Sequence, residues 1–250
     1  MYNYLQEKYN INRLRLGTAI SFLLLIVLIM GGILSELGVI KNTPSWAPNL
    51  FMIVGSLIIL FFSDRKLRLL YIAIGTIGFL YEVIGVKFGF LFGAYSYSDV
   101  FNLQLFSVPL VMISAWIIIA NFTNSFLRNM KKIYFIILGS LLMVITDLVI
   151  DPIAVDGLEI WIWENPGQYY GIPNHNFYGW FILSLPIFYL LSFSKNEIHL
   201  MSRVVSNLVI SFFSIIGIIN DIIFPSVLGI FLVLVNLYLY IKNKSKENAI

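Results

Sequence analysis

The sequence predicts an all-α membrane protein that crosses the bilayer several times, and three observations support this fold class. Hydrophobic residues make up 59% of the 250 residues and charged residues only 12%, whereas soluble domains have roughly 25% charged residues. The mean hydropathy is +0.88. The apolar residues form long runs separated by short polar breaks, and about 20 apolar residues suffice for a transmembrane helix. This composition argues against both a soluble enzyme and a disordered chain.

Eight apolar runs are expected to form transmembrane helices within one integral-membrane domain, residues 1–250, because no linker or internal repeat divides the chain. The runs cover residues 17–34, 46–62, 69–86, 103–122, 133–150, 177–193, 204–219 and 225–241. The first is too long for a signal peptide and lacks a cleavage site, so it is expected to remain as an anchor. Pro152 should end the fifth helix. The last two runs are close enough to form a tight hairpin, or a re-entrant pair, around Asn220 and Asp221.

The basic residues predict the orientation of the chain. On an eight-span model, 14 of the 16 Lys and Arg residues fall on one side of the membrane. They are Lys8, Arg13, Arg15, Arg65, Lys66, Arg68, Arg128, Lys131, Lys132, Lys195, Arg203, Lys242, Lys244 and Lys246. Basic loops stay in the cytoplasm, so both termini are expected to be cytoplasmic. The expected localisation is the cytoplasmic membrane, as a multi-pass protein.

The residue types that are rare in this chain limit its chemistry. The sequence has no cysteine and two histidines, His175 and His199. Disulfides, thiolate metal sites and cysteine nucleophiles are therefore impossible, and a multi-histidine metal site is excluded. There is no phosphate-binding loop. We expect no metal and no cofactor, and nothing in the sequence indicates a nucleic-acid partner.

The acidic residues gather on the side opposite the basic ones. Glu82 lies well inside the third apolar run, where a charged group is costly, so it should face the interior of the bundle. Asp147 and Asp151 are four residues apart and share one helix face. No Lys or Arg lies within four residues of Glu82 or Asp147, so we expect these two carboxyl groups to be largely protonated. The alternative to a functional role is structural: Glu82 would form a hydrogen bond between helices, and Asp151 would be a simple carboxylate at a helix end.

The longest segment outside the predicted helices, residues 151–176, contains no Lys or Arg and is rich in aromatic residues. Trp161, Trp163, Tyr169 and Tyr170 could form an aromatic belt at the membrane interface. Together with Gly and Pro turn residues, they favour a folded lid over a cavity. Asn176, at the start of the sixth helix, is either near a helix cap or one of the polar groups that hold a water.

Several spaced motifs follow one another over roughly residues 82–180. Their fragments are Glu82-Val-Ile-Gly85, Phe88-Gly89, Phe92-Gly93-Ala94-Tyr95-Ser-Tyr97, Val108-Pro109, Trp116, Asp147-Leu-Val-Ile-Asp151-Pro152, Trp161-Ile-Trp163, Gly167-Gln-Tyr169-Tyr170-Gly171-Ile-Pro173 and Asn176-Phe-Tyr-Gly179-Trp180. In this order, they resemble the carotenoid hydratase family. The resemblance implies addition of water to a terminal isoprenoid double bond of an acyclic carotenoid, giving a tertiary alcohol without a cofactor. It also implies a hydro-lyase that works in the lipid bilayer, with association with other carotenoid-pathway enzymes as a further expectation.

The chemistry of alkene hydration fits these residues. Protonation makes a tertiary carbocation, so it needs an acid, which a buried neutral carboxyl group can supply. Aromatic faces stabilise a cation without trapping it, and a held water then attacks. The acid–base candidates are Glu82, Asp147 and Asp151, with Asn176 placing the water. The expected aromatic wall for the substrate consists of Tyr95, Trp116, Trp161, Trp163, Tyr169 and Tyr170.

Two other functions fit parts of the sequence. Asp147 and Asp151 have the spacing of a magnesium–diphosphate motif of an intramembrane prenyltransferase. Such enzymes pair two Asp-rich motifs and need basic residues for the diphosphate, whereas here Asn220-Asp221 stands alone and only Lys41 and Lys87 share the acidic side. Intramembrane carboxylates would also suit a transporter of lipid or one coupled to protons. Against this, no inverted repeat is visible, and the carboxylates cluster at one membrane face.

Overall fold

The computed structural model describes residues 2–127, 130–194 and 197–247. These residues contain eight α-helices, and each overlaps one of the predicted runs. The helices are α1 (Tyr2–Glu36), α2 (Ala47–Phe62), α3 (Arg65–Phe88), α4 (Met112–Asn124), α5 (Lys132–Pro152), α6 (Asn174–Leu191), α7 (Leu200–Ile219) and α8 (Ile223–Glu247). Among the basic residues used for the topology, Arg128 and Lys195 lie outside the described residues, as do the side chains of Lys8, Arg13, Arg15 and Lys246.

Five helices in the described part of the chain are long and apolar enough to cross a bilayer. They are the Leu16–Glu36 part of α1, α3, α5 with the turn that follows it, α7 and α8. The helices α2 and α4 are apolar but shorter, and α6 begins with the polar residues Asn174, His175 and Asn176. The fold is therefore that of an all-helical membrane protein, while the total of eight spans stays a prediction.

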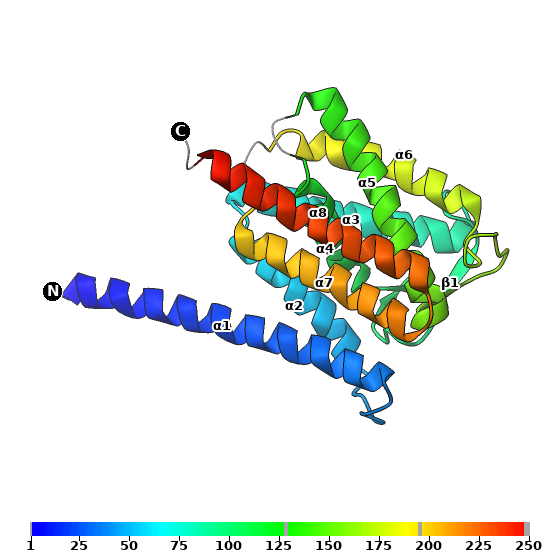
Figure 1. The fold of residues 1–250 in the computed structure, drawn as a ribbon, viewed down its shortest axis with the longest axis horizontal. Helices are drawn as coiled ribbons and strands as arrows, with labels where there is room; N and C mark the ends of the chain where they lie inside the picture. The colour runs from blue at the N-terminus through cyan, green and yellow to red at the C-terminus, as the bar shows by residue number, and fades with distance from the viewer. Residues whose placement is uncertain (1, 128–129, 195–196, 248–250) are drawn as a thin grey trace.

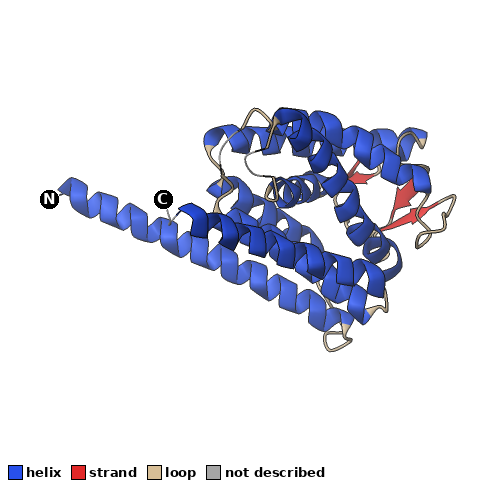
Figure 2. Cartoon of the chain, turned by 45° about the horizontal axis from the view of Figure 1, so that its top comes forward, coloured by secondary structure: helices blue, strands red, loops and turns tan. Residues whose placement is uncertain are grey.

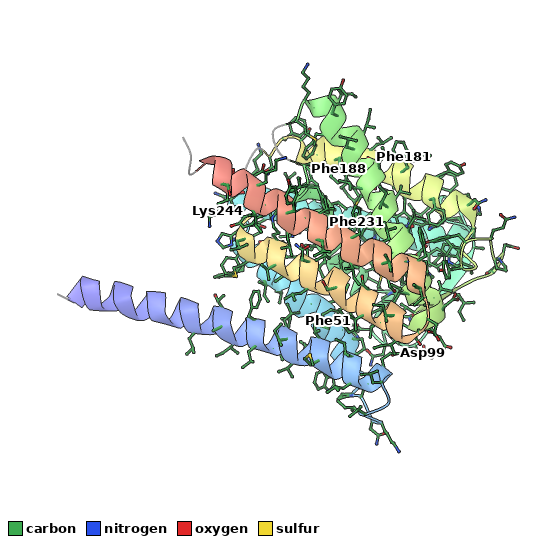
Figure 3. All side chains as sticks on the ribbon, viewed as in Figure 1. Phe51, Asp99, Phe181, Phe188, Phe231 and Lys244 are labelled. Atoms are coloured by element: carbon green, nitrogen blue, oxygen red, sulfur yellow. The ribbon has the colours of Figure 1, made fainter. Side chains whose placement is uncertain are left out.

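The outer surfaces of the helices are apolar, as a bilayer requires. Leu23, Phe61, Leu80, Ile182 and Phe231 are each more than half exposed on different helices, and Phe231 lies on the outer side of α8 in Figure 3. Soluble monomers rarely expose continuous apolar surface on this scale. Lipid tails are the natural neighbours of these side chains.

The sequence predicts one helix over residues 103–122, but these residues do not form a single helix in the structure. Their first part instead contains a small hairpin of β2 (Gln104–Leu105) and β3 (Val108–Pro109), and α4 begins only at Met112. Phe106 and Ser107 both have positive φ angles, 55° and 62°, as a tight two-residue hairpin turn requires. Pro109 also disfavours helical backbone at the residue before it. Apolar composition alone could not reveal this turn.

The helices pack as neighbouring pairs, α3 with α4, α5 with α6 and α7 with α8. In Figure 1, the amino-terminal part of α1 extends beyond the other helices, and its start lies at the same end of the molecule as the end of α8. The strands lie at the opposite end, as Figure 2 shows. This arrangement does not show which end faces the cytoplasm, so the orientation stays a prediction.

A buried polar network joins helices near the carboxyl end of α4 and the amino end of α7. The Arg203 guanidinium donates to Asn236 Oδ1 at 2.7 Å and to the Ser125 carbonyl at 2.8 Å. Asn121 Nδ2 donates to the Ser202 carbonyl at 2.9 Å. Because buried polar groups are costly unless they are bonded, this network fixes how α4, α7 and α8 meet.

Candidate functional site

A cavity lies beside the strand-bearing end of the bundle, with the predicted carboxyl groups on its wall. Glu82, Asp147, Asp151 and Asn176 all line it, and about 810 Å³ of space is free of atoms, including its open mouth. The centre of a water molecule can occupy about 70 Å³, and one water needs roughly 10–15 Å³ by the same measure. The cavity is therefore narrow but has room for several waters. Most of its wall is apolar or aromatic, with side chains such as Met112, Ile119 and Phe213.

Glu82 is held by three hydrogen-bond donors from different parts of the chain. It lies two turns before the end of α3 and is 7% exposed. Its Oε2 accepts a short hydrogen bond from the Tyr95 hydroxyl and one of 2.9 Å from the Tyr97 hydroxyl. Its Oε1 accepts from Trp116 Nε1 at 3.1 Å. All three partners are uncharged, so the carboxyl group is fixed in place without a salt bridge to any described residue.

Asp147 and Asp151 form a second carboxyl site, bridged by Asn176. One helical turn separates them on α5, so both side chains point the same way, and each is 3% exposed. Asn176 Nδ2 donates to Asp147 Oδ2 at 2.9 Å and to Asp151 Oδ2 at 2.7 Å. Asn176 does not cap α6, because the helix begins two residues earlier, at Asn174, after Pro173. Asn176 instead holds two carboxyl groups close together.

The end of α5 is unusual, and it positions the two aspartates. Pro152 has no N–H, so it leaves the carbonyl of Leu148, four residues earlier, without its helical partner. The Tyr169 hydroxyl donates to that carbonyl at 2.8 Å. After Pro152 the chain continues as a π-helical turn, Ile153–Gly157, a form often found at functional sites. The segment after the helix is thus tied back to the turn between the two aspartates.

Two short antiparallel strands place four aromatic rings at the site. In β1 (Tyr95–Tyr97) and β4 (Trp161–Trp163), Tyr95 pairs with Trp163 and Tyr97 with Trp161. Alternate side chains of a strand share a face, and all four of these residues line the cavity. Ile162, between the two tryptophans, is 61% exposed. This two-stranded ribbon of β1 and β4 therefore covers the cavity with one aromatic face.

The pKa values of Tyr95 and Tyr97 are raised well above the usual value for a phenol. Burial is the main cause, because it penalises the phenolate, and the negative charge of Glu82 acts in the same direction. Both hydroxyls therefore stay protonated and can donate to Glu82 over the whole neutral and moderately alkaline range.

The structure brings together eight of the ten predicted site residues. Tyr169 and Tyr170 do not line the cavity. Tyr169 braces α5 instead, and its ring packs edge-on against Tyr170. The motifs also contained Tyr97 and Trp180, which were not assigned to the site. The Tyr95-x-Tyr97 spacing could have revealed Tyr97, since it places both rings on one face of a strand.

Trp180 became part of the site through packing that the sequence does not show. Its ring stacks on Trp116 with centroids 4.5 Å apart and an angle of 18° between the planes. Both rings line the cavity. In the described part of the chain, no group of three or more His, Asp or Glu side chains is arranged to hold a metal ion.

Comparisons with known proteins agree with this site. A family model described as "Carotenoid biosynthesis protein" matches residues 48–236, which include the cavity walls. The chain is 29% identical over 150 residues to bisanhydrobacterioruberin hydratase of Haloarcula japonica, a match that covers 56% of this chain and 50% of the relative. The chain thus spans about half the length of that curated relative. No solved structure matches it significantly. These findings confirm the resemblance to carotenoid hydratases.

Proposed function

Because the chain belongs to the carotenoid biosynthesis protein family, we propose that it is a hydro-lyase that adds water to the terminal double bond of an acyclic carotenoid. The substrate would reach the site from the bilayer, and the enzyme would work without a cofactor as a multi-pass protein of the cytoplasmic membrane. The hydratase name of the relative from Haloarcula japonica supports this reaction type. Association with other enzymes of the pathway remains a prediction.

One observation carries the proposal: three buried carboxyl groups face an aromatic, apolar cavity whose described lining residues include no Lys, Arg or His. Such a wall suits a hydrocarbon that must be protonated. A cationic side chain near the reacting carbon would oppose the carbocation that protonation creates. Trp116 and Trp180 supply ring faces that attract a cation.

The reaction would proceed in two steps. A protonated carboxyl group donates its proton to the less substituted carbon of the terminal double bond, leaving a tertiary carbocation. A water oxygen then forms a bond to that carbon, and the proton that it loses passes to a carboxylate. Proton donors and acceptors of this kind typically contribute 10²–10⁴-fold to rate. Asn176 keeps two of the carboxyl groups aligned for this exchange.

The test is pigment analysis after co-expression with enzymes that make an acyclic carotenoid. We expect a new, more polar carotenoid that has gained the mass of one water per hydrated end. A chain with Asp147→Asn, expressed to the same level, is the control and should give little of it. Unchanged pigment with a well-folded chain would refute the proposal.

The two other functions are less well supported. A prenyltransferase must bind a diphosphate, which requires basic side chains or metal ions, and the described wall of the cavity carries no basic residue. A transporter needs a polar path across the membrane, whereas the three carboxyl groups lie together beside the strands. Neither function has an observation that favours it over hydration.

A further inference from the structure

One buried polar atom of a residue that lines the cavity has no partner in the described part of the chain. It is Trp163 Nε1, which makes no hydrogen bond there, and Trp163 as a whole is 8% exposed. An indole N–H can only donate. By contrast, Trp116 donates its N–H to Glu82. Buried donors are nearly always bonded, so the N–H of Trp163 calls for an acceptor atom, which an oxygen bound in the adjoining cavity can supply.

The position of Trp163 relates that acceptor to Glu82. Trp163 lies opposite Tyr95 in the ribbon, and their ring centroids are 4.9 Å apart. The Tyr95 hydroxyl bonds to Glu82. Glu82 Oε2 already accepts two hydrogen bonds, whereas Oε1 accepts one, from Trp116, and each carboxylate oxygen has two lone pairs. The Glu82 side of the cavity therefore offers one donor and one remaining acceptor position, which suits a water molecule.

The Asp147–Asp151 pair is suited to hold a proton rather than to bind water. Both Oδ2 atoms bind the same Asn176 nitrogen, and no described residue on the cavity wall is cationic. Two carboxylates this close in an apolar site repel one another, so at rest such a pair shares one proton. The pair gives that proton up as the positive charge of the carbocation forms beside it. Glu82 instead accepts three hydrogen bonds, which stabilise its carboxylate form against the cost of burial, whereas the two aspartates share one amide donor. The proton for the substrate is thus stored on the aspartate pair.

We propose that the cavity divides the reaction between two sides: the Asp147–Asp151 pair donates the proton, and Trp163 Nε1–H with Glu82 binds the oxygen of the attacking water and of the product alcohol. This division rests on the proposed hydratase function. It makes Trp163 a water-binding residue as well as part of the aromatic wall.

The steps balance in atoms and charge. The aspartate pair loses its shared proton as a new C–H bond forms, and the π bond becomes a carbocation. Water, which accepts from Trp163 and donates to Glu82, forms the C–O bond and passes its proton to Glu82. That proton returns to the aspartate pair through water in the cavity, so the enzyme is restored without any other reactant.

The division predicts that protonation and water capture can be separated by mutation. Reactions in D2O measure both, because a carbocation that is not captured loses a proton and returns as an alkene that carries deuterium or a shifted double bond. With Trp163→Phe we expect alcohol per folded protein to fall by about 10²-fold, as for the loss of one well-placed donor, while the recovered alkene gains deuterium. Asp147→Asn and Asp151→Asn should lose both alcohol and deuterium uptake.

The controls keep this inference separate from the proposed function. Trp46→Phe changes an exposed tryptophan outside the cavity and should alter neither measurement. If the unmodified chain gives neither alcohol nor deuterium uptake, the hydratase function itself is wrong. If it hydrates normally but folded Trp163→Phe keeps its alcohol yield, or loses alcohol and deuterium uptake equally, the division is wrong. Glu82→Gln should behave like Trp163→Phe, and it decides the question if the tryptophan variant does not fold.

Discussion

The three buried carboxyl groups differ in what holds them, although the sequence shows them only as acids at membrane depth. Glu82 accepts from two phenols and an indole, whereas Asp147 and Asp151 share one amide donor. None of these partners carries a charge. A purely structural carboxyl group would need no such aromatic surroundings beside a cavity.

The first prediction concerns the acids themselves. Glu82→Gln, Asp147→Asn and Asp151→Asn keep the size of each side chain but remove its acidity. Because general acid–base catalysis typically contributes 10²–10⁴-fold, we expect hydration to fall by roughly that factor. Product per folded protein, measured for each variant in detergent, checks this. Near-normal turnover in all three would show that the proton comes from elsewhere.

The second prediction concerns a close packing contact. A Cβ at Gly78 would overlap the ring of Trp116, so Gly78→Ala should displace Trp116 and break its hydrogen bond to Glu82. Overpacking of this kind costs about 1–3 kcal/mol in stability, and we expect activity to fall at least tenfold as well. Gly31→Ala is the matched control, because nothing lies within 4 Å of a Cβ there. Thermal unfolding and turnover should both separate the two variants.

At the scale of elements, the end of α5 is decisive for the site. Pro152 ends the regular helix one residue after Asp151, and the π-helical turn follows. The Tyr169 hydroxyl compensates for the hydrogen bond that proline cannot donate to Leu148. The segment that follows α5 thereby returns to stabilise the end of that helix, and strand β4 lies within this segment, between Pro152 and Tyr169.

The third prediction tests that brace. Tyr169→Phe removes only the hydroxyl, and a typical hydrogen bond contributes about 0.5–1.5 kcal/mol. We expect stability to fall by about that amount and turnover to fall a few-fold, with KM nearly unchanged because the ring is not on the cavity wall. Tyr170→Phe should have the smaller effect, since its hydroxyl forms no hydrogen bond with a described residue. Equal effects of the two changes would argue against the brace.

At the scale of the whole molecule, the two ends of the helical bundle are expected to lie on opposite sides of the membrane. The start of α1 and the end of α8 lie at one end, and the strands lie at the other (Figure 2). The fourth prediction is that reporter fusions at the carboxyl tail and in the loop near Glu164 report opposite sides of the membrane, with the tail cytoplasmic. Both reporters on the same side would contradict the eight-span topology.

The fifth prediction concerns metal dependence. Acid catalysis by carboxyl groups needs no Lewis acid, so hydration should survive exhaustive chelation. The measurement is turnover before and after chelator treatment, with magnesium added back. Activity that is lost and then restored by magnesium would favour the prenyltransferase interpretation, in which Asp147 and Asp151 bind a metal–diphosphate.

The sequence by itself determined the helical membrane fold, the approximate position of each helix and the acidic residues of the site. Hydrophobic runs and buried charges are local properties, because a bilayer imposes its energetic cost on each segment separately. The start of the fourth helix was missed because a two-residue turn is as apolar as the helix that follows it.

Only the tertiary structure decided how those residues meet. Glu82 and Trp116 are 34 positions apart, Asp147 and Asn176 are 29 apart, and Tyr97 and Trp161 face one another only because β1 pairs with β4. The same packing took Tyr169 away from the cavity wall and added Trp180 to it. Such contacts depend on how helices and strands fit together, which no short window of sequence encodes. Trp163 looks like any interfacial tryptophan in the sequence, and only burial without a partner distinguishes it.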